Sequence, residues 1–237
     1  FLLASSRNLI IDNDIQPEVA WNIGGSITQY FMVGKREWNV TAEYYRTWFE
    51  NQLVVDMDSD IRSIHFSNLN GESYSNTYQI ELSSPIVKGL DMRTAFRYND
   101  VKQTINGKLM EVPLTTRSKG FVTLSYKTPL GKWQFDGTAQ LNGGGRIPST
   151  AANPEILQRA DHFDPYPVFN AQITKYFKTW NVYFGVENIM DFKQENPIID
   201  AGNPYGEYFD AAMIWGPLEG RKIYLGIRWE LKNLNKK

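Results

Sequence analysis

Cysteine is absent from this chain of 237 residues, so no disulfide holds it together, which fits periplasmic and cytosolic folding equally. Long apolar runs are absent as well, and no stretch approaches the roughly 18 residues of a transmembrane helix. The formal net charge is −1, so the chain lacks the positive surplus typical of nucleic-acid-binding proteins. A basic segment before an apolar stretch is also missing from residues 1–7, so they form no secretory signal. For an exported protein, we expect the N-terminal part to be missing from this sequence.

Aromatic residues are plentiful instead, at 14% of the chain, and they favour strands. Apolar and polar residues alternate along nine segments, as expected of strands with one apolar face. In the last of them, Ile223, Leu225 and Ile227 share one face, while Gly226 and Arg228 lie on the other. The predicted strands are 21–31, 38–48, 74–86, 89–105, 108–128, 132–142, 166–178, 180–188 and 221–231.

Tight turns alternate with long polar connections between these strands. The tight turns are predicted at 33–36, 87–89, 129–132 and 177–179, and the long connections at 57–73, 143–166 and 190–220. This rhythm is typical of an outer-membrane β-barrel, whose short turns are periplasmic and whose long loops are extracellular. A further turn, Asn106-Gly107, is a strong hairpin signal and predicts an extracellular hairpin beyond the membrane. Pro113 then requires an edge position or a bulge.

Strand length separates a barrel from a sandwich, which also alternates. Most of the predicted strands reach the roughly 9–11 residues that cross a bilayer at a tilt, about twice the usual strand length. Nine is an odd number, and an open sheet would leave two unpaired edges in lipid, which is not tolerated. We therefore predict an all-β fold, the C-terminal part of a larger transmembrane antiparallel barrel. Aromatic residues near strand ends are placed as in an interface girdle: Trp21, Trp38, Tyr44, Trp48, Trp133, Trp180 and Trp229.

Three segments resemble TonB-dependent outer-membrane receptors, especially those of Bacteroidetes. They are PEVAWN at 17–22, NLNGESYSN at 68–76 and GPLEGRKIYLGIR at 216–228. The resemblance implies that residues 1–237 are the C-terminal part of a barrel that has 22 strands in such transporters, with the plug domain and signal peptide upstream. One departure is the end of the chain, where 232–237 follow Leu231 in place of a terminal aromatic residue.

By the same resemblance, the intact protein would lie in the outer membrane of a Gram-negative bacterium and import a scarce ligand with energy from the TonB complex. The ligand would be a metal chelate, a vitamin or a glycan. The implied partners are outer-membrane lipid, the TonB complex through the missing N-terminal region, and that small-molecule or glycan ligand. A surface lipoprotein is left open, and no nucleic acid is expected.

Candidate ligand contacts lie in the long loops, because aromatic faces stack on sugars and chelates. We select Tyr205, Tyr208, Phe209, Trp215 and His162, although the residues of loop 190–220 could equally pack that loop on itself. Lumen-facing charges are a second set, for which mutual pairing or contact with a plug is favoured over ligand gating. They are Arg93, Arg97, Glu187 and Arg228.

Catalytic and metal chemistry find little support. The cluster Asp161-His162-Phe163-Asp164 alone cannot supply the three or four converging ligands of a stable metal site. No Ser/His/Asp arrangement is supported, and Gly143-Gly144-Gly145 lacks the helix and lysine of a phosphate loop. We therefore expect no catalytic residues, no metal and no cofactor. The alternatives are a passive porin-type channel and a soluble carbohydrate-binding β-sandwich, which would bury Trp133, Phe135, Trp180 and Phe184 in a core.

Overall fold

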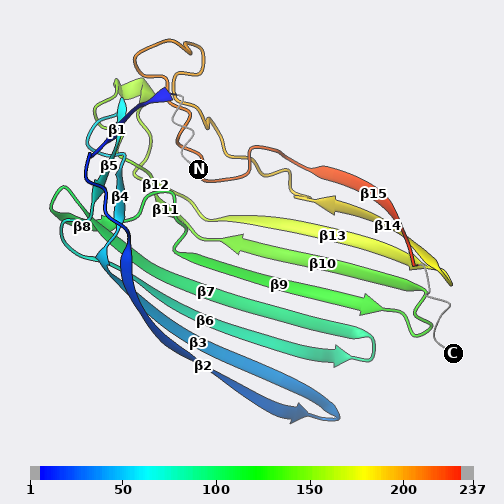
Figure 1. Cartoon of the computed structure of the whole chain (residues 1–237). Coiled ribbons are helices and arrows are strands. Elements are labelled where there is room, and N and C mark those ends of the chain that lie inside the picture. The colour runs from blue at the N-terminus through cyan, green and yellow to red at the C-terminus, as the bar shows by residue number, and fades with distance from the viewer. Residues whose placement is uncertain (1–5, 231–237) are drawn as a thin grey trace.

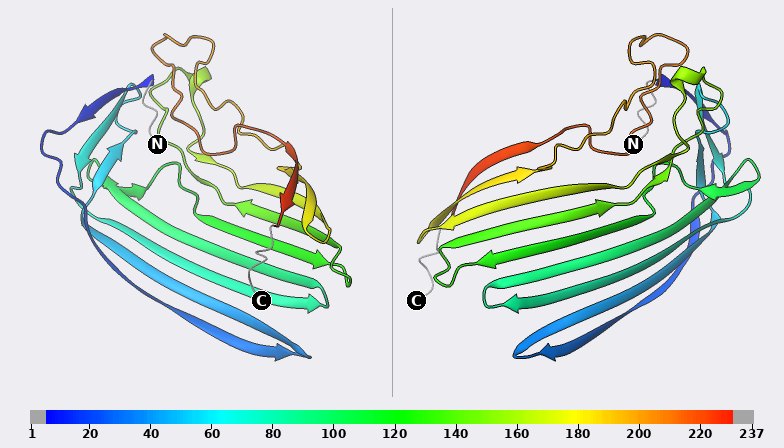
Figure 2. Two further views of the ribbon diagram at one scale, coloured as in Figure 1. Left: turned by 45° about the vertical axis from the view of Figure 1, so that its right-hand side comes forward. Right: turned by 180° about the vertical axis from the view of Figure 1, so that it is seen from behind.

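The computed structural model describes residues 6–230, and one large antiparallel sheet forms most of it (Figure 1). Within these residues, nine strands follow one another in the order β15-β14-β13-β10-β9-β7-β6-β3-β2, and β8 pairs with β7 alone. Figures 1 and 2 show the sheet as an open, curved wall. The strands are β2 (Val19–Val33), β3 (Arg36–Asn51), β6 (Ser73–Val87), β7 (Leu90–Ile105), β8 (Lys108–Glu111), β9 (Ser118–Lys127), β10 (Trp133–Asn142), β13 (Tyr166–Tyr176), β14 (Trp180–Glu187) and β15 (Lys222–Trp229).

The tight turns lie where the sequence predicts them, at one end of the wall. Gly89 shows why glycine is needed there: its φ is +84°, and a Cβ atom would collide with the carbonyl oxygen of Lys127. The β7–β8 turn has φ values of 51° at Asn106 and 72° at Gly107, as a type I′ turn requires. Local turn chemistry therefore sets the strand pairing on both sides of each reversal.

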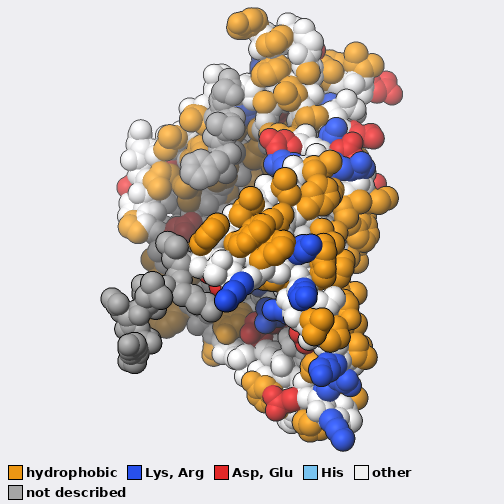
Figure 3. Space-filling model, turned by 90° about the vertical axis from the view of Figure 1, so that its right-hand side faces the viewer, with side chains coloured by type: hydrophobic (Ala, Val, Ile, Leu, Met, Phe, Trp, Pro, Cys, Tyr) orange, Lys and Arg blue, Asp and Glu red, His pale blue; other side chains and the backbone are white. Residues whose placement is uncertain are grey.

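The register aligns apolar residues from strand to strand on one face of the wall. Leu225 lies opposite Phe184, which lies opposite Ile173, which in turn lies opposite Phe135. These side chains are not covered, since Leu225 is 72% exposed and Phe135 is 44% exposed. Figure 3, which views the wall from the end with the tight turns, shows hydrophobic side chains gathered along one side. The sheet is a single layer with an apolar face open to its surroundings.

This exposure is incompatible with the sandwich alternative. A sandwich would bury Phe135 and Phe184, yet Phe184 is 45% exposed and Trp133 is 37% exposed. The described residues provide no second sheet over this face. The sandwich hypothesis is therefore wrong, and the all-β prediction of a barrel wall is confirmed.

Aromatic side chains lie at both ends of the apolar face. Trp180 pairs with Trp229 beside the tight turns, and Trp180 also stacks on Phe177 at 4.0 Å between ring centroids. At the other end of the wall, Trp21 lies opposite Trp48. Two aromatic bands about one strand length apart are the arrangement that interfacial girdles require.

One predicted strand is wrong in its extent, because segment 108–128 is two strands. β8 pairs with the C-terminal part of β7, from Lys102 to Ile105, and β9 pairs with the N-terminal part, from Leu90 to Tyr98. Pro113 lies between β8 and β9, where it has no ladder hydrogen bond to donate. The last predicted strand, 221–231, is shorter at both ends, and residues 231–237, including Leu231, lie outside the described residues.

Two of the connections that we predicted as loops contain short strands. β4 (Leu53–Asp56) and β5 (Ser63–Asn68) form a separate sheet with β1 (Asn8–Ile11), in which β1 and β5 are parallel. β11 (Gly145–Arg146) pairs with β12 (His162–Phe163), and η2 (Glu155–Leu157) is a single 3₁₀ turn. No helix in residues 6–230 is long and apolar enough to span a membrane.

Candidate functional site

The end of the wall opposite the tight turns carries the loops and short strands, which we call the loop platform. It holds the β1-β5-β4 sheet, the tip of the β7–β8 hairpin, the β11–β12 pair and the long connection between β14 and β15. Both views in Figure 2 place these segments together. The platform comprises residues 6–18, 52–72, 103–117, 143–165 and 188–221.

A buried ion pair joins the two parts of the platform that are farthest apart in the sequence. Arg7 donates through Nε and Nη2 to Oδ2 of Asp210, at 3.1 and 2.6 Å, and through Nη1 to the carbonyl oxygen of Met57 at 3.0 Å. The side chains of Arg7 and Asp210 are only 1% and 6% exposed. Three segments of the chain therefore meet at one guanidinium group.

A second ion pair connects the β11–β12 segment to the β4–β5 turn. Arg146 donates through both terminal nitrogens to the Asp58 carboxylate, at 2.7 and 2.9 Å. The Nε of Arg146 also donates to the carbonyl oxygen of Glu111 at 2.7 Å, and Asp58 accepts the Ser149 amide at 2.8 Å. Such bidentate contacts fix orientation as well as distance.

Asp56 holds the same turn by accepting hydrogen bonds. Burial opposes its ionisation, but donors on Ser59, Asp58 and Asn106 outweigh this and hold the pKa of Asp56 below its ordinary value of 3.8. The Asn106 amide donates at 2.9 Å and the Asp58 N–H at 2.8 Å. The turn of the β4–β5 hairpin is thereby attached to the tip of the β7–β8 hairpin.

A lowered pKa has a defined effect on stability. The ionised Asp56 stabilises the platform above the ordinary carboxyl pKa, and this contribution is lost as the pH falls through the lowered value. We expect Asp56→Asn to remove that acid-dependent component when protease cleavage of segment 53–62 is followed against pH. Asp12→Asn is the matched control, because the Asp12 carboxylate is exposed and lies beside the His65 ring, away from the turn that Asp56 holds. Equal pH profiles for Asp56→Asn and the unmodified protein would contradict this role.

Aromatic rings form the core of the platform. Trp215 stacks on Phe163 with ring centroids 4.7 Å apart and planes 6° apart, and Tyr166 stacks on Phe192 at 4.6 Å and 3°. Trp215 also meets the Tyr166 ring at 5.6 Å, so the two stacks form one cluster. Phe163 belongs as well to a buried apolar cluster with Ile147, Ile199 and Met213, against which Trp215 packs.

Gln194 fastens the long connection over this cluster. Its side-chain nitrogen donates to the carbonyl oxygen of Met213 at 2.7 Å, and its side-chain oxygen accepts the amides of Trp215 and Gly216 at 2.9 and 3.1 Å. Gln194 is buried, so each of these hydrogen bonds replaces one with water. The segment 190–220 is therefore an ordered part of the platform without a strand of its own.

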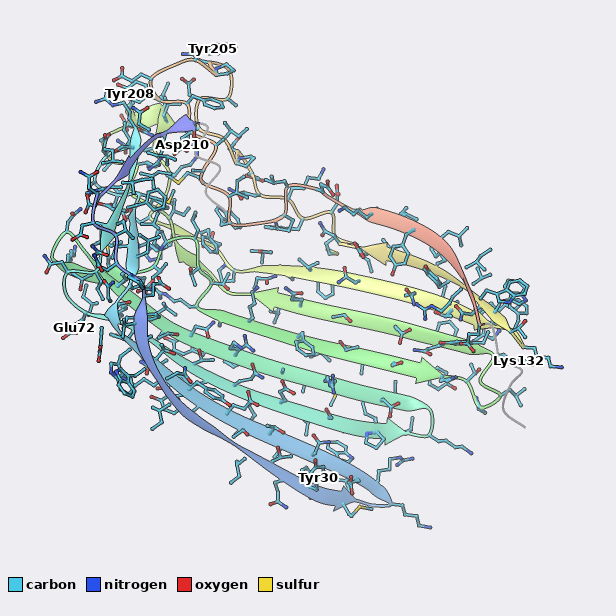
Figure 4. All side chains as sticks on the ribbon, viewed as in Figure 1. Tyr30, Glu72, Lys132, Tyr205, Tyr208 and Asp210 are labelled. Atoms are coloured by element: carbon cyan, nitrogen blue, oxygen red, sulfur yellow. The ribbon has the colours of Figure 1, made fainter. Side chains whose placement is uncertain are left out.

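The predicted ligand contacts fall into two groups. Tyr205 is fully exposed at the tip of the long connection, and Tyr208 lies below it (Figure 4). Tyr208 and Phe209 are both half-buried. Trp215 and His162 instead border one hollow on the platform. The structure thus separates the tip residues from Trp215, whose ring packs against Phe163 and Tyr166 inside the platform.

That hollow has a volume of about 680 Å³ and combines aromatic walls with charges of both signs. Phe163, Tyr166 and Phe192 form the wall beside Trp215. Its charged residues are Arg159, Asp164, Asp191, Lys193 and Glu195. Sequence reasoning considered Asp164 only as a metal ligand and missed the other four, because they come from separate loops and form no motif. The size is that of an ordinary small-molecule site.

The four predicted lumen charges share the polar face of the wall. Arg97 donates to Oε1 of Gln79 at 2.6 Å, and Arg93 lies opposite Ser83 and Thr123. Glu187 lies opposite Lys222, and Arg228 lies opposite Asn181. None of the four forms an ion pair within residues 6–230. The polar face consequently presents charges that remain open to further partners.

Metal chemistry has no cluster to support it in the part of the chain that the structure describes. No three His, Cys, Asp or Glu side chains converge there. His162 instead has its Nε2 at 3.5 Å from Nη2 of Arg117. The site offers aromatic faces, hydrogen-bonding groups and charges, which suit binding.

Together, the single-layer wall, its apolar face and its loop-bearing end define the class: a segment of a membrane-spanning β-barrel. Residues 4–189 match the model of the TonB dependent receptor-like β-barrel family. The chain belongs to this family. None of the curated proteins compared with this chain matches it.

Solved structures share the fold at low sequence identity. The pyoverdine outer membrane receptor FpvA from Pseudomonas aeruginosa PAO1, bound to pyoverdine, has a TM-score of 0.59 at 14% identity, over 91% of this chain and 30% of its own. The siderophore receptor PiuA from Acinetobacter baumannii gives 0.53 at 16%, over 90% and 28%. The copper transporter OprC gives 0.65 at 13%, over 92% and 32%. The chain thus spans less than a third of each of these structures.

Proposed function

We propose that this chain is the C-terminal part of the barrel of an outer-membrane receptor, which imports a scarce ligand with energy from the TonB complex. The observation that carries the proposal is the uncovered apolar face, which runs across nine strands in register and ends at aromatic bands. An exposed apolar face of this size is stable in contact with lipid. A sheet can span a bilayer only as a closed barrel, because an open edge would leave backbone groups unpaired in the hydrocarbon. The chain itself would supply wall and loops and no catalysis, in a Gram-negative outer membrane.

Among the ligand classes, a metal chelate is favoured over a vitamin or a glycan. Two of the similar structures are described as a pyoverdine receptor and a siderophore receptor, which supports a chelate. Trp215 and His162 would contact it in the platform hollow, where charges of both signs allow hydrogen bonding around an aromatic wall. Tyr205 at the tip and Tyr208 below it (Figure 4) would make the first contact, together with Phe209, the next residue in the chain.

The proposed partners follow from the same reading. A plug and a TonB-contacting segment would belong to the N-terminal region outside this sequence, and Arg93, Arg97, Glu187 and Arg228 would face the plug from the polar side of the wall. The Bacteroidetes type and a surface lipoprotein over the loops are further parts of the proposal. The family match favours a receptor over a passive porin-type channel.

The first test is a scan of single spin labels along positions 222–230 in the full-length parent protein in lipid vesicles. We expect labels at 223, 225, 227 and 229 to contact lipid and the intervening labels to be accessible to water, because the strand alternates between the two faces. A uniformly aqueous pattern would overturn the membrane assignment and the transport proposal with it.

A further inference from the structure

The apolar face of the wall continues into a groove at its platform end. One register row runs Phe96, Gly120, Leu141, Pro167 across four strands, and it lines the lower part of the groove. Gly120 lies between two large neighbours in this row, so the surface is hollowed there. The volume is about 580 Å³. The row belongs to the face that would contact lipid, so the groove opens towards the hydrocarbon of the bilayer.

Basic side chains lie at the upper end of the groove. Arg117 and His162 both line it, with Nη2 of Arg117 at 3.5 Å from Nε2 of His162. Glu111 accepts hydrogen bonds from Nε and Nη2 of Arg117, but the Arg117 side chain stays 48% exposed. An anionic group could therefore approach the guanidinium from the groove, at the level where lipid headgroups begin.

We propose that this groove is a specific lipid site, which holds one acyl chain of a phosphorylated outer-leaflet lipid with its phosphate against the Arg117 guanidinium. The inference rests on the proposed membrane assignment, because the platform must be extracellular for the groove to meet the outer leaflet. Two observations select this occupant: the apolar floor is continuous with the face that would contact lipid, and the Arg117 guanidinium lies at the platform end of the groove. Arg and Lys near an interface attract phosphate in this way.

Gly120 allows the groove to be filled without strain. A Cβ atom there would lie 3.6 Å from the nearest atoms, on Ala95 and Phe96, which is ordinary contact. Gly137 is a matched control on the same face, outside the groove, where a Cβ would meet nothing within 4 Å. Gly120→Trp should occupy the space of the acyl chain, whereas Gly137→Trp should leave the groove open.

The experiment is native mass spectrometry of the full-length parent protein in mild detergent, with an added diphosphorylated glucosamine lipid or phosphatidylethanolamine as the probe. We expect the unmodified protein and Gly137→Trp to retain one glucosamine lipid per chain and Gly120→Trp to lose it. If Gly120→Trp retains the glucosamine lipid equally well, or if none of the three proteins retains it, the proposal that the groove binds lipid is overturned.

Arg117→Gln provides a second test that does not depend on the tryptophan variants folding. It should weaken binding of the diphosphorylated glucosamine lipid to the level of phosphatidylethanolamine, which carries a single phosphate, and an unchanged preference for the glucosamine lipid would overturn the phosphate assignment. The spin-label scan separates the two proposals: a period-two pattern with no retained lipid leaves the membrane assignment standing and removes only the groove.

Discussion

Asp210→Asn is expected to loosen the loop platform by about 3–5 kcal/mol, since it leaves the Arg7 guanidinium buried without its counter-charge. The reporter is the Ile199 amide, which donates to the carbonyl oxygen of residue 210 at 2.8 Å. Its hydrogen exchange in the full-length protein should accelerate by roughly two to four orders of magnitude, at tenfold per 1.4 kcal/mol. The wall amides should exchange as before, because the ion pair lies outside the barrel strands.

Glu207→Gln is the matched control on the same loop. Glu207 pairs with Arg62 at 2.8 Å, but these side chains are 56% and 59% exposed. Solvent-exposed pairs contribute about 0–1 kcal/mol, so exchange at Ile199 should change little. Similar acceleration in both variants would show that the buried ion pair has no special part in holding the platform.

Leu225→Arg is expected to destabilise the inserted barrel by roughly 2–4 kcal/mol, because it places a charge on the lipid face near the middle of β15. The measurement is denaturant unfolding of the full-length protein in lipid vesicles. Gly226, on the opposite face, is no suitable control, because any side chain there would collide with the Tyr183 ring.

Gln172→Arg is the better control for that experiment. Gln172 lies on the polar face at a similar height, opposite Gly185, and Asp136 lies beside it in the register, so a new arginine would gain an anionic neighbour. We expect a far smaller loss of stability than for Leu225→Arg. Equal losses at the two positions would mean that the wall has no distinct lipid face.

Strand alternation and turn chemistry were sufficient to predict the wall. Leu225 and Phe184 share a face because each strand alternates with period two, and local turns such as Asn106-Gly107 fix the pairing between neighbours. These signals are local, so a single sequence carries them. The break between β8 and β9 was missed because Pro113 was assigned to an edge or a bulge, whereas it marks the end of a strand.

The platform could not be predicted in the same way. β1 pairs in parallel with β5 across more than fifty residues, and nothing in the short segment 8–11 indicates that partner. Arg7 and Asp210 carry no mutual signal in the sequence either. The sequence places Trp215 in a long loop, but its stacking on Phe163 depends on how loops from different hairpins meet. Its proposed contact with a ligand remains a prediction.

The distance in sequence between Arg7 and Asp210 has a consequence for the order of assembly. The wall grows from hairpins whose strands are neighbours in the chain, and closing short loops costs little conformational entropy. The ion pair joins residues 203 positions apart, so it can form only after every hairpin between them has brought its ends together. The loop platform therefore matures only after the wall strands from β2 to β14, which lie between Arg7 and Asp210 in the chain, have found their places.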